Sequence, residues 1–241
     1  MDPNSSRVPR DDGPSAIVED GPSTIVEGKA SDQSDAQLGG ILAAFRRNPA
    51  AAPLMVLFGL LQLMMDVPTN LIILNLQAEF WGPHMTQIGA SFGIAGLLLG
   101  TICAAPFGRV GDTLGQRVAV FIHACLLSLP IFALVVFGET ARGLWACSAA
   151  GVLRGISGTT MTGAPCQYAL VHEMTLPGDY ETFVGMAYAT ISVLTIVGLC
   201  LAKWVDRQAG GVGVLWLCSA IFLVVVASLL CLRGPSGASQ A

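Results

Sequence analysis

Two long apolar runs joined by a short polar segment constrain this chain more than any other feature. The runs Ile88 to Phe107 and Val118 to Gly138 contain no Asp, Glu, Lys or Arg. Each is long enough to cross a bilayer as a helix, which takes about 20 apolar residues. The ten residues between them, Gly108 to Arg117, read G-R-V-G-D-T-L-G-Q-R. A connection this short predicts that the two helices are antiparallel neighbours and that a polar hinge joins them.

The composition agrees with a chain built for lipid. Hydrophobic residues make up 53% of it and charged residues only 12%, whereas a soluble domain has about 25% charged residues. The net charge of −4 is concentrated in residues 1–40, which hold eight acids and three bases. Because no basic patch is present, a nucleic-acid partner is not expected. The sequence therefore predicts an all-α integral membrane protein surrounded by membrane lipid.

Four parts follow one another along the chain. We expect a disordered acidic cytosolic tail (1–36), an amphipathic juxtamembrane helix (37–48), a bundle of six transmembrane helices (49–233) and a C-terminal tail (234–241). The juxtamembrane helix is predicted by apolar residues spaced i, i+3, i+4, i+7 and followed by two arginines that suit lipid headgroups: Leu38, Ile41, Leu42, Phe45, Arg46 and Arg47. The predicted spans are Pro53–Leu76, Ile88–Phe107, Val118–Gly138, Leu144–Val171, Phe183–Ala202 and Leu215–Leu232.

Polar residues inside the first span indicate a water-filled cavity or a partner. Gln62, Asp66 and Asn70 are four residues apart and share one face of a regular helix. A carboxylate within a spanning helix does not face lipid, because exposing it there costs several kcal/mol. The fourth span carries a second interior charge, Arg154.

Glycines recur at helical spacing in two spans. Such stripes of small residues let helix backbones touch, so they predict helix packing. The residues are Gly89, Gly93, Gly96 and Gly100 in the second span, and Gly151, Gly155 and Gly158 in the fourth.

The hinge resembles the cytoplasmic signature of the major facilitator superfamily, G-x-x-x-D-[RK]-x-G-[RK]-[RK]. Matching residues are Gly108, Asp112, Gly115 and Arg117, while Thr113 and Gln116 stand where that family prefers basic residues. Two further segments resemble the same family. Arg154 and Gly158 match its fourth-helix R-x-x-Q-G pattern with Ser157 in place of Gln, and the segment after the fourth span matches at Glu173, Pro177 and Gly185.

This resemblance implies a fold and a function. The fold is one six-helix half of a major facilitator transporter, made of two inverted three-helix repeats. The function is secondary active or facilitative transport of a small solute, with protons as a candidate coupling ion. Because that fold normally has two halves, either a second six-helix half joins this one, as another copy or a separate chain, or the chain is a truncated product. The alternative is a transport-inactive membrane scaffold or regulatory half-transporter.

The resemblance also assigns roles to residues. The substrate or ion pathway comprises Gln62, Asp66, Asn70 and Arg154, with Asp66 and Arg154 as a buried pair whose role is either functional or purely structural. The gating hinge comprises Gly108, Asp112, Gly115, Arg117 and Glu173, with a charge pair between Arg117 and Glu173. His123, in the third span, is either a structural hydrogen-bonding group or a proton relay. The fifth span lacks the family's antiporter proline.

Residues for enzymatic chemistry are not apparent in the sequence. The chain shows no Ser/His/Asp arrangement, nucleotide loop or metal-ligand spacing, so we expect no catalytic residue, metal or cofactor. The seven cysteines all lie in apolar runs, where cysteine behaves as a small hydrophobic residue. The hydrophilic start and the excess of arginines near the predicted inner ends of the spans favour cytoplasmic N- and C-termini.

Overall fold

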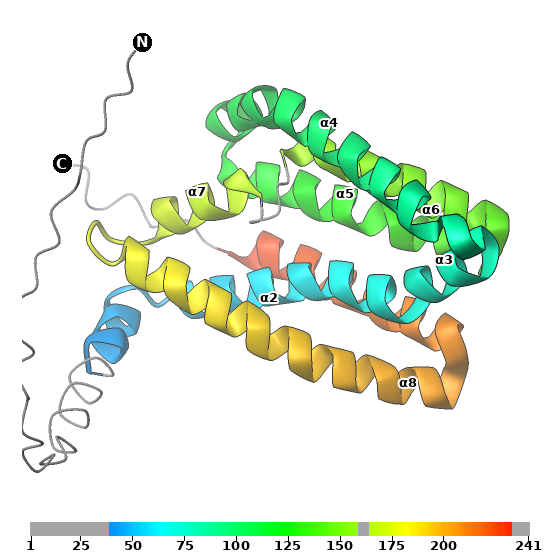
Figure 1. Ribbon diagram of the computed structural model, residues 1–241. Coiled ribbons are helices and arrows are strands. Elements are labelled where there is room, and N and C mark those ends of the chain that lie inside the picture. Colours follow the sequence, from blue (N-terminus) through cyan, green and yellow to red (C-terminus); the bar gives the residue numbers. More distant parts are fainter. Residues whose placement is uncertain (1–38, 159–163, 233–241) are drawn as a thin grey trace, which may run out of the picture. The chain divides into compact units, whose positions relative to one another are not determined.

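Helices form all the regular structure in the described part of the chain. The computed structural model (Figure 1) describes residues 39–158 and 164–232. From Gly40 onward these residues belong to one compact unit. The tails predicted at 1–36 and 234–241 lie outside the described residues. Residues 40–47 of the predicted juxtamembrane segment are helical.

The helices follow one another with short connections. Their bounds are α2 Ala51–Pro68, a π-helical segment Thr69–Ile73, α3 Leu74–Trp81, a 3-10 turn Gly82–His84, α4 Met85–Leu114, α5 Gln116–Phe137, α6 Ala141–Leu153, a 3-10 segment Arg154–Ser157, α7 Pro165–Met174 and α8 Tyr180–Cys231.

Three helical stretches are long and apolar enough to cross a membrane: Ala51–Leu114, Gln116–Phe137 and Tyr180–Cys231. The first and last contain 64 and 52 residues, far more than the roughly 20 that one crossing needs. Each of them reverses direction at a glycine with positive φ, Gly82 (49°) and Gly210 (66°) (Figure 1). Such φ values strain residues that carry a Cβ, so glycine permits the reversal without an intervening loop.

The polar hinge predicted at Gly108–Arg117 is wrong in its extent. Helix α4 continues to Leu114, and only Gly115, with φ of 92°, separates it from α5. Thr113 bonds the carbonyl of Arg109 within the same helix, at 2.8 Å. The segment stays helical because a helix satisfies its own backbone groups in lipid and in water alike, so polar residues alone do not end it.

Two predicted spans are interrupted. In the first, Pro68 has no N–H to continue the helical ladder, and the π-helical segment follows it directly. The fourth span, predicted as continuous from Leu144 to Val171, is broken: α6 ends at Leu153, the 3-10 segment ends before left-handed Gly158, and α7 begins at Pro165. Proline suits the first turn of a new helix, which explains the restart. The predicted fifth and last spans both lie within α8.

Where helices α2 and α8 pack together, a leucine of each helix lies against a glycine of the other. A Cβ on Gly59 of α2 would lie 2.2 Å from Leu194 Cδ1, and a Cβ on Gly198 of α8 would lie 2.0 Å from Leu63 Cδ2. Real side chains do not approach this closely. The two glycines therefore set the separation of the helices, and much of α2 is buried in the core.

The two predicted glycine stripes meet over part of their length. A Cβ on Gly155 would lie 2.3 Å from the carbonyl oxygen of Gly96 and 3.0 Å from the nitrogen of Gly100. Gly158 lies over Ala104 of α4, where a Cβ would be 3.1 Å from its Cα. In contrast, a Cβ on Gly93 or Gly151 would meet nothing within 4 Å. Close contact between α4 and the 3-10 segment is thus concentrated at Gly155.

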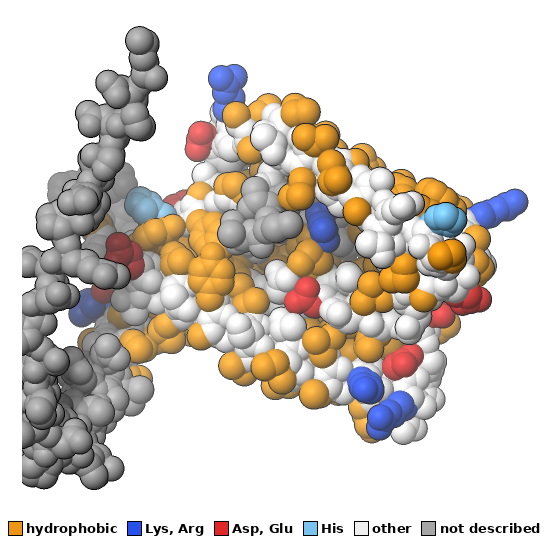
Figure 2. Space-filling model, in the orientation of Figure 1, with side chains coloured by type: hydrophobic (Ala, Val, Ile, Leu, Met, Phe, Trp, Pro, Cys, Tyr) orange, Lys and Arg blue, Asp and Glu red, His pale blue; other side chains and the backbone are white. Residues whose placement is uncertain are grey.

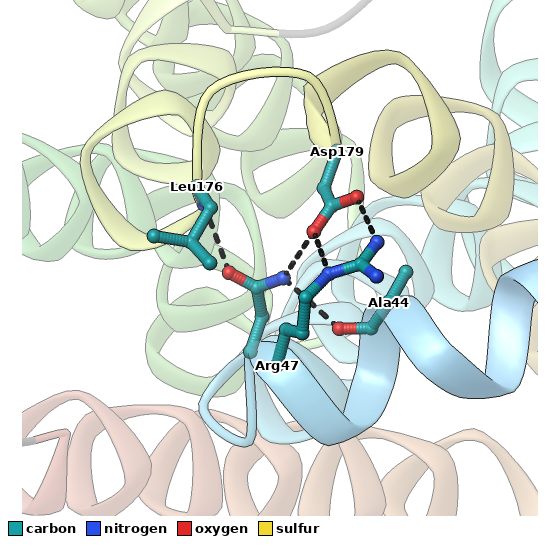
Figure 3. A network of polar contacts seen from close by, with 5 residues as sticks. Ala44, Arg47, Leu176 and Asp179 are labelled. Atoms are coloured by element: carbon teal, nitrogen blue, oxygen red, sulfur yellow. Dashed lines mark hydrogen bonds and ion pairs between the residues drawn. The ribbon is translucent and has the colours of Figure 1, made fainter.

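A polar network fastens the helix at 40–47 to the connection between α7 and α8 (Figure 3). Arg47 donates from Nη2 and Nε to the two Asp179 oxygens, at 2.6 and 3.1 Å. Asn48, which is only 4% exposed, donates to Asp179 and to the Ala44 carbonyl, both at 2.9 Å, and accepts from the Leu176 N–H at 2.8 Å. The rings of Phe45 and Phe183 meet edge to face, with centroids 5.2 Å apart. We call this set the 47–179 clamp.

The charge pair of the clamp has a defined pH dependence. The hydrogen bond from Arg47 holds the pKa of the Asp179 carboxyl below its ordinary value of 3.8, and raises the pKa of Arg47. A lowered carboxyl pKa means that the folded state favours the ionised form. The contribution of this ion pair to stability is therefore complete above pH values near 3.8. It is lost as the pH falls through the lowered pKa of Asp179.

The charge pair predicted between Arg117 and Glu173 is wrong. Arg117 donates instead to the backbone carbonyl of Leu232, at the end of α8. Glu173 is exposed on α7, and the ion pair between Arg47 and Asp179 is the only one among the described residues. The end of α8 supplies an unsatisfied carbonyl that attracts a cation, which explains the choice of Arg117.

We expect Gly155→Ala to lower the free energy of unfolding by about 1–3 kcal/mol, because the added methyl overpacks the contact with Gly96. Gly151→Ala, one helical turn away, is the matched control, since its methyl meets nothing within 4 Å. Apparent melting temperatures of the detergent-purified variants measure both. Equal effects of the two substitutions would contradict the proposed contact.

Within the clamp, we expect Asn48→Ala to be more destabilising than Arg47→Ala. The asparagine change removes three hydrogen bonds and leaves the Leu176 N–H without its partner, which costs about 1–3 kcal/mol. The arginine change removes a pair whose Arg47 side chain is exposed, so water screens part of its attraction, and Asp179 keeps its bond from Asn48 in that variant. Hydrogen–deuterium exchange over residues 40–48, together with melting temperatures, measures the order of the two effects; the reverse order would be inconsistent with this network.

Candidate functional site

A cavity of about 480 Å³ lies within the bundle, between α2, α4, α5, α6 and the two interrupted regions. Cavities of this size hold small organic molecules. Its apolar wall includes Met64, Met65, Phe92, Leu127 and Ile131. Its polar wall consists of Gln62, Thr69, Gln77, His123, Ser148, Arg154 and Gln167. Figure 2 shows one face of the molecule, on which a basic side chain is recessed among hydrophobic ones.

The predicted pathway residues are only partly on this wall. Gln62 and Arg154 line the cavity, whereas Asp66 lies beside it and Asn70 is exposed. The π-helical segment Thr69–Ile73 follows Asp66, and of its residues Thr69 and Ile73 line the cavity while Asn70 does not. The Asn70 amide instead donates to the carbonyl of Asp66, at 2.8 Å, and the Thr69 hydroxyl donates to the carbonyl of Met65, at 2.6 Å.

Asp66 is held by two neutral donors. Its Oδ1 accepts from Gln62 Nε2 at 3.1 Å, and its Oδ2 lies 3.4 Å from the hydroxyl of Thr195 on α8. The buried ion pair predicted between Asp66 and Arg154 is wrong, since no such pair lies within 4.0 Å in the described residues. The reason is the orientation of α2, whose packing against α8 turns the carboxylate toward Thr195.

Arg154 opens the 3-10 segment and is half-buried. Among the described residues its guanidinium makes no ion pair and no side-chain hydrogen bond. Its backbone carbonyl accepts from the Ser157 hydroxyl at 2.8 Å. The neighbouring Gly155 lets this segment lie directly on α4, so the packing of glycine on glycine fixes where the Arg154 backbone sits at the cavity wall.

His123 connects α5 to the same segment. Its ring is 2% exposed, and its Nδ1 lies 2.9 Å from the Ser157 hydroxyl. Ser157 stands where the major facilitator pattern prefers Gln, and here it joins His123 to the backbone of Arg154. The sequence left two roles open for His123, and this contact matches the structural hydrogen-bonding role. A proton-relay role stays a prediction.

The predicted gating residues lie together only in part. Asp112 is exposed on the last turn of α4, and Gly108 is exposed within the same helix. Gly115 and Arg117 form the turn into α5, and Glu173 is on α7. Neither Asp112 nor Glu173 has an ion-pair partner among the described residues. The structure therefore does not link these acids to the turn.

Several residues of the site were not predicted from the sequence. Gln77, Ser148, Gln167 and Thr195 were missed, although each is a polar residue inside or beside an apolar run, the same signal that identified Gln62. An aromatic cluster, Trp81, Phe92 and Trp145, was missed as well. Its ring centroids are 5.5 to 6.0 Å apart, and Phe92 joins it to the cavity.

No three His, Cys, Asp or Glu side chains in the described residues are arranged to hold a metal ion. Seven cysteines in the described ranges are free, and Cys147, Cys166 and Cys218 are buried.

Comparison with known proteins neither supports nor contradicts the resemblance to the major facilitator superfamily. The sequence matches no protein-family model and no curated protein. Among the described residues, the site offers an apolar chamber with one cation, Arg154, and several neutral hydrogen-bonding groups, an arrangement that can bind a small molecule.

We expect Gln62→Met to destabilise the protein by about 1–3 kcal/mol, because it removes the 3.1 Å donor from a half-buried carboxylate. In an Asp66→Leu background the same change should be close to neutral, since no carboxylate remains to be satisfied. Melting temperatures of the wild type, the two single variants and the double variant complete a double-mutant cycle that measures the coupling between Gln62 and Asp66. Additive effects would show that Gln62 does not support Asp66.

Proposed function

We propose that this protein is a transporter of a small solute, of the major facilitator type, whose substrate pathway runs through the cavity at Gln62 and Arg154. The observation that carries the proposal is a polar, singly charged chamber inside an apolar bundle, bordered by two interrupted helices. Broken helices are where membrane transporters build their sites, because backbone irregularity is tolerated there only beside a cavity or buried in protein.

The direction of the chain supports a multi-pass arrangement. Reversals at Gly82 and Gly210 divide the two longest stretches into antiparallel pairs. Together with α5 and the interrupted α6–α7 region, these pairs amount to six crossings in the described part of the chain. An even number of crossings puts the helix at 40–47 and the end of α8 on the same side, for which the arginines favour the cytoplasm.

The remaining roles follow from this assignment. Asp112, exposed at the end of α4, meets a second six-helix half and gates the cytoplasmic side. That half is a second copy, a separate chain or a further part of a longer protein. Asp66, beside the cavity and bonded to Gln62, is the candidate group for coupling to protons.

Labelling of native cysteines tests the proposal without knowledge of the substrate. Cys147 lines the cavity, while Cys218 is equally buried but lies away from it, so they form a matched pair. Single-cysteine variants are reconstituted in liposomes and treated from one side at a time with membrane-impermeant methanethiosulfonates. An anionic and a cationic reagent are used in parallel, so that charge does not decide access.

We expect Cys147 to react from each side in turn, because a transporter opens its cavity alternately to the two compartments. Cys218 should react from neither side. Reaction of Cys147 from only one side, or from none, would favour the transport-inactive scaffold instead.

A further inference from the structure

We propose that the cavity selects small organic anions with an apolar body, and that Arg154 binds their carboxylate. This inference rests on the proposed function only for the consequence that such anions are transported; the binding it describes is measured separately.

The charges on the cavity wall carry the argument. Among the described residues that line it, Arg154 is the only Asp, Glu, Lys or Arg. An arginine side chain remains protonated under all physiological conditions. The described part of the wall therefore presents one fixed positive charge and no carboxylate.

Asp66 does not cancel this charge by direct contact. It is absent from the wall, it makes no ion pair with Arg154, and its two oxygens face Gln62 and Thr195. The guanidinium has no ion-pair partner among the described residues, so its five donors remain available to a bound carboxylate. A carboxylate matches the planar fork of arginine with two parallel hydrogen bonds.

The other residues of the cavity wall determine what the rest of the ligand molecule can be. Met65, Phe92 and Ile131 provide apolar surface, and methionine adapts its shape to different ligands. The amides of Gln62 and Gln77 bind polar substituents without adding charge. A cationic ligand would be repelled by Arg154, and a neutral one would leave its guanidinium without an anionic hydrogen-bond acceptor.

Isothermal titration calorimetry on the full chain in detergent tests this selection with probes of one shape. The probes are 3-phenylpropanoate (an anion), 3-phenylpropanamide (neutral), phenethylamine (a cation) and phenylalanine (a zwitterion). We expect 3-phenylpropanoate to bind at least about tenfold more tightly than the amide, since a charge-assisted hydrogen bond is stronger than a neutral one. Phenethylamine should not bind.

Two variants locate the selectivity. Arg154→Gln should reduce the affinity for 3-phenylpropanoate about tenfold or more and leave that for the amide unchanged. Arg154→Lys keeps the charge and should retain the preference for the anion. Size-exclusion chromatography confirms that each variant is folded; if Arg154→Gln is not, the probe series on wild type and Arg154→Lys decides.

Three results would overturn the proposal: equal affinity for the anion and the amide, tighter binding of phenethylamine, or phenylalanine binding best and losing its advantage in Asp66→Asn. The last result would identify a zwitterion site shared between Arg154 and Asp66. These outcomes are distinct from failure of the transport proposal. Two-sided labelling of Cys147 with no preference for the anion would leave a transporter of a different substrate class, and selective anion binding with one-sided labelling would leave a receptor.

Discussion

The arrangement of this bundle depends on satisfying its polar groups internally. A chain this apolar has few places where water can complete a hydrogen bond, and each unsatisfied group in lipid costs several kcal/mol. The region around Pro68 shows how this is done. The proline interrupts the ladder, and the side chains of Thr69 and Asn70 bond carbonyls one turn earlier. The polar residues of the first span thus serve the backbone as well as the cavity.

Glycine determines the bundle in two separate ways. At Gly82, Gly115 and Gly210 it allows the backbone to turn within one residue, which keeps the helices antiparallel and adjacent. At Gly59, Gly155 and Gly198 it leaves room for a neighbouring helix that a methyl group would displace. Since Gly155 directly follows Arg154, the second use also positions the only fixed cation among the described residues of the cavity wall.

The 47–179 clamp connects the amphipathic helix to the bundle through polar contacts rather than through apolar burial alone. Asn48 is its centre, because it is buried and bonds three partners, one of them the backbone N–H that begins the α7–α8 connection. In the Arg47–Asp179 pair on its outer side the arginine is exposed, so this pair adds less. Any movement of α8 relative to α2 would act on this network, which joins the segments that precede each of the two helices.

The sequence alone determined that the chain is helical and apolar enough for a membrane, and it identified the turning glycine at 115 and the interior residues Gln62 and Arg154. These features depend on local properties: the length of an apolar run, the conformational range of glycine and the cost of a charge in lipid. Tertiary structure decided the partners. Asp66 bonds Thr195, 129 residues away, instead of Arg154, and Arg117 bonds the end of α8 instead of Glu173. It also decided that Asn70 is exposed outside the cavity and that only part of each glycine stripe is in contact. Which face a helix turns to its neighbours depends on its rotation and on residues distant in sequence, and the periodicity of a single segment does not contain that information.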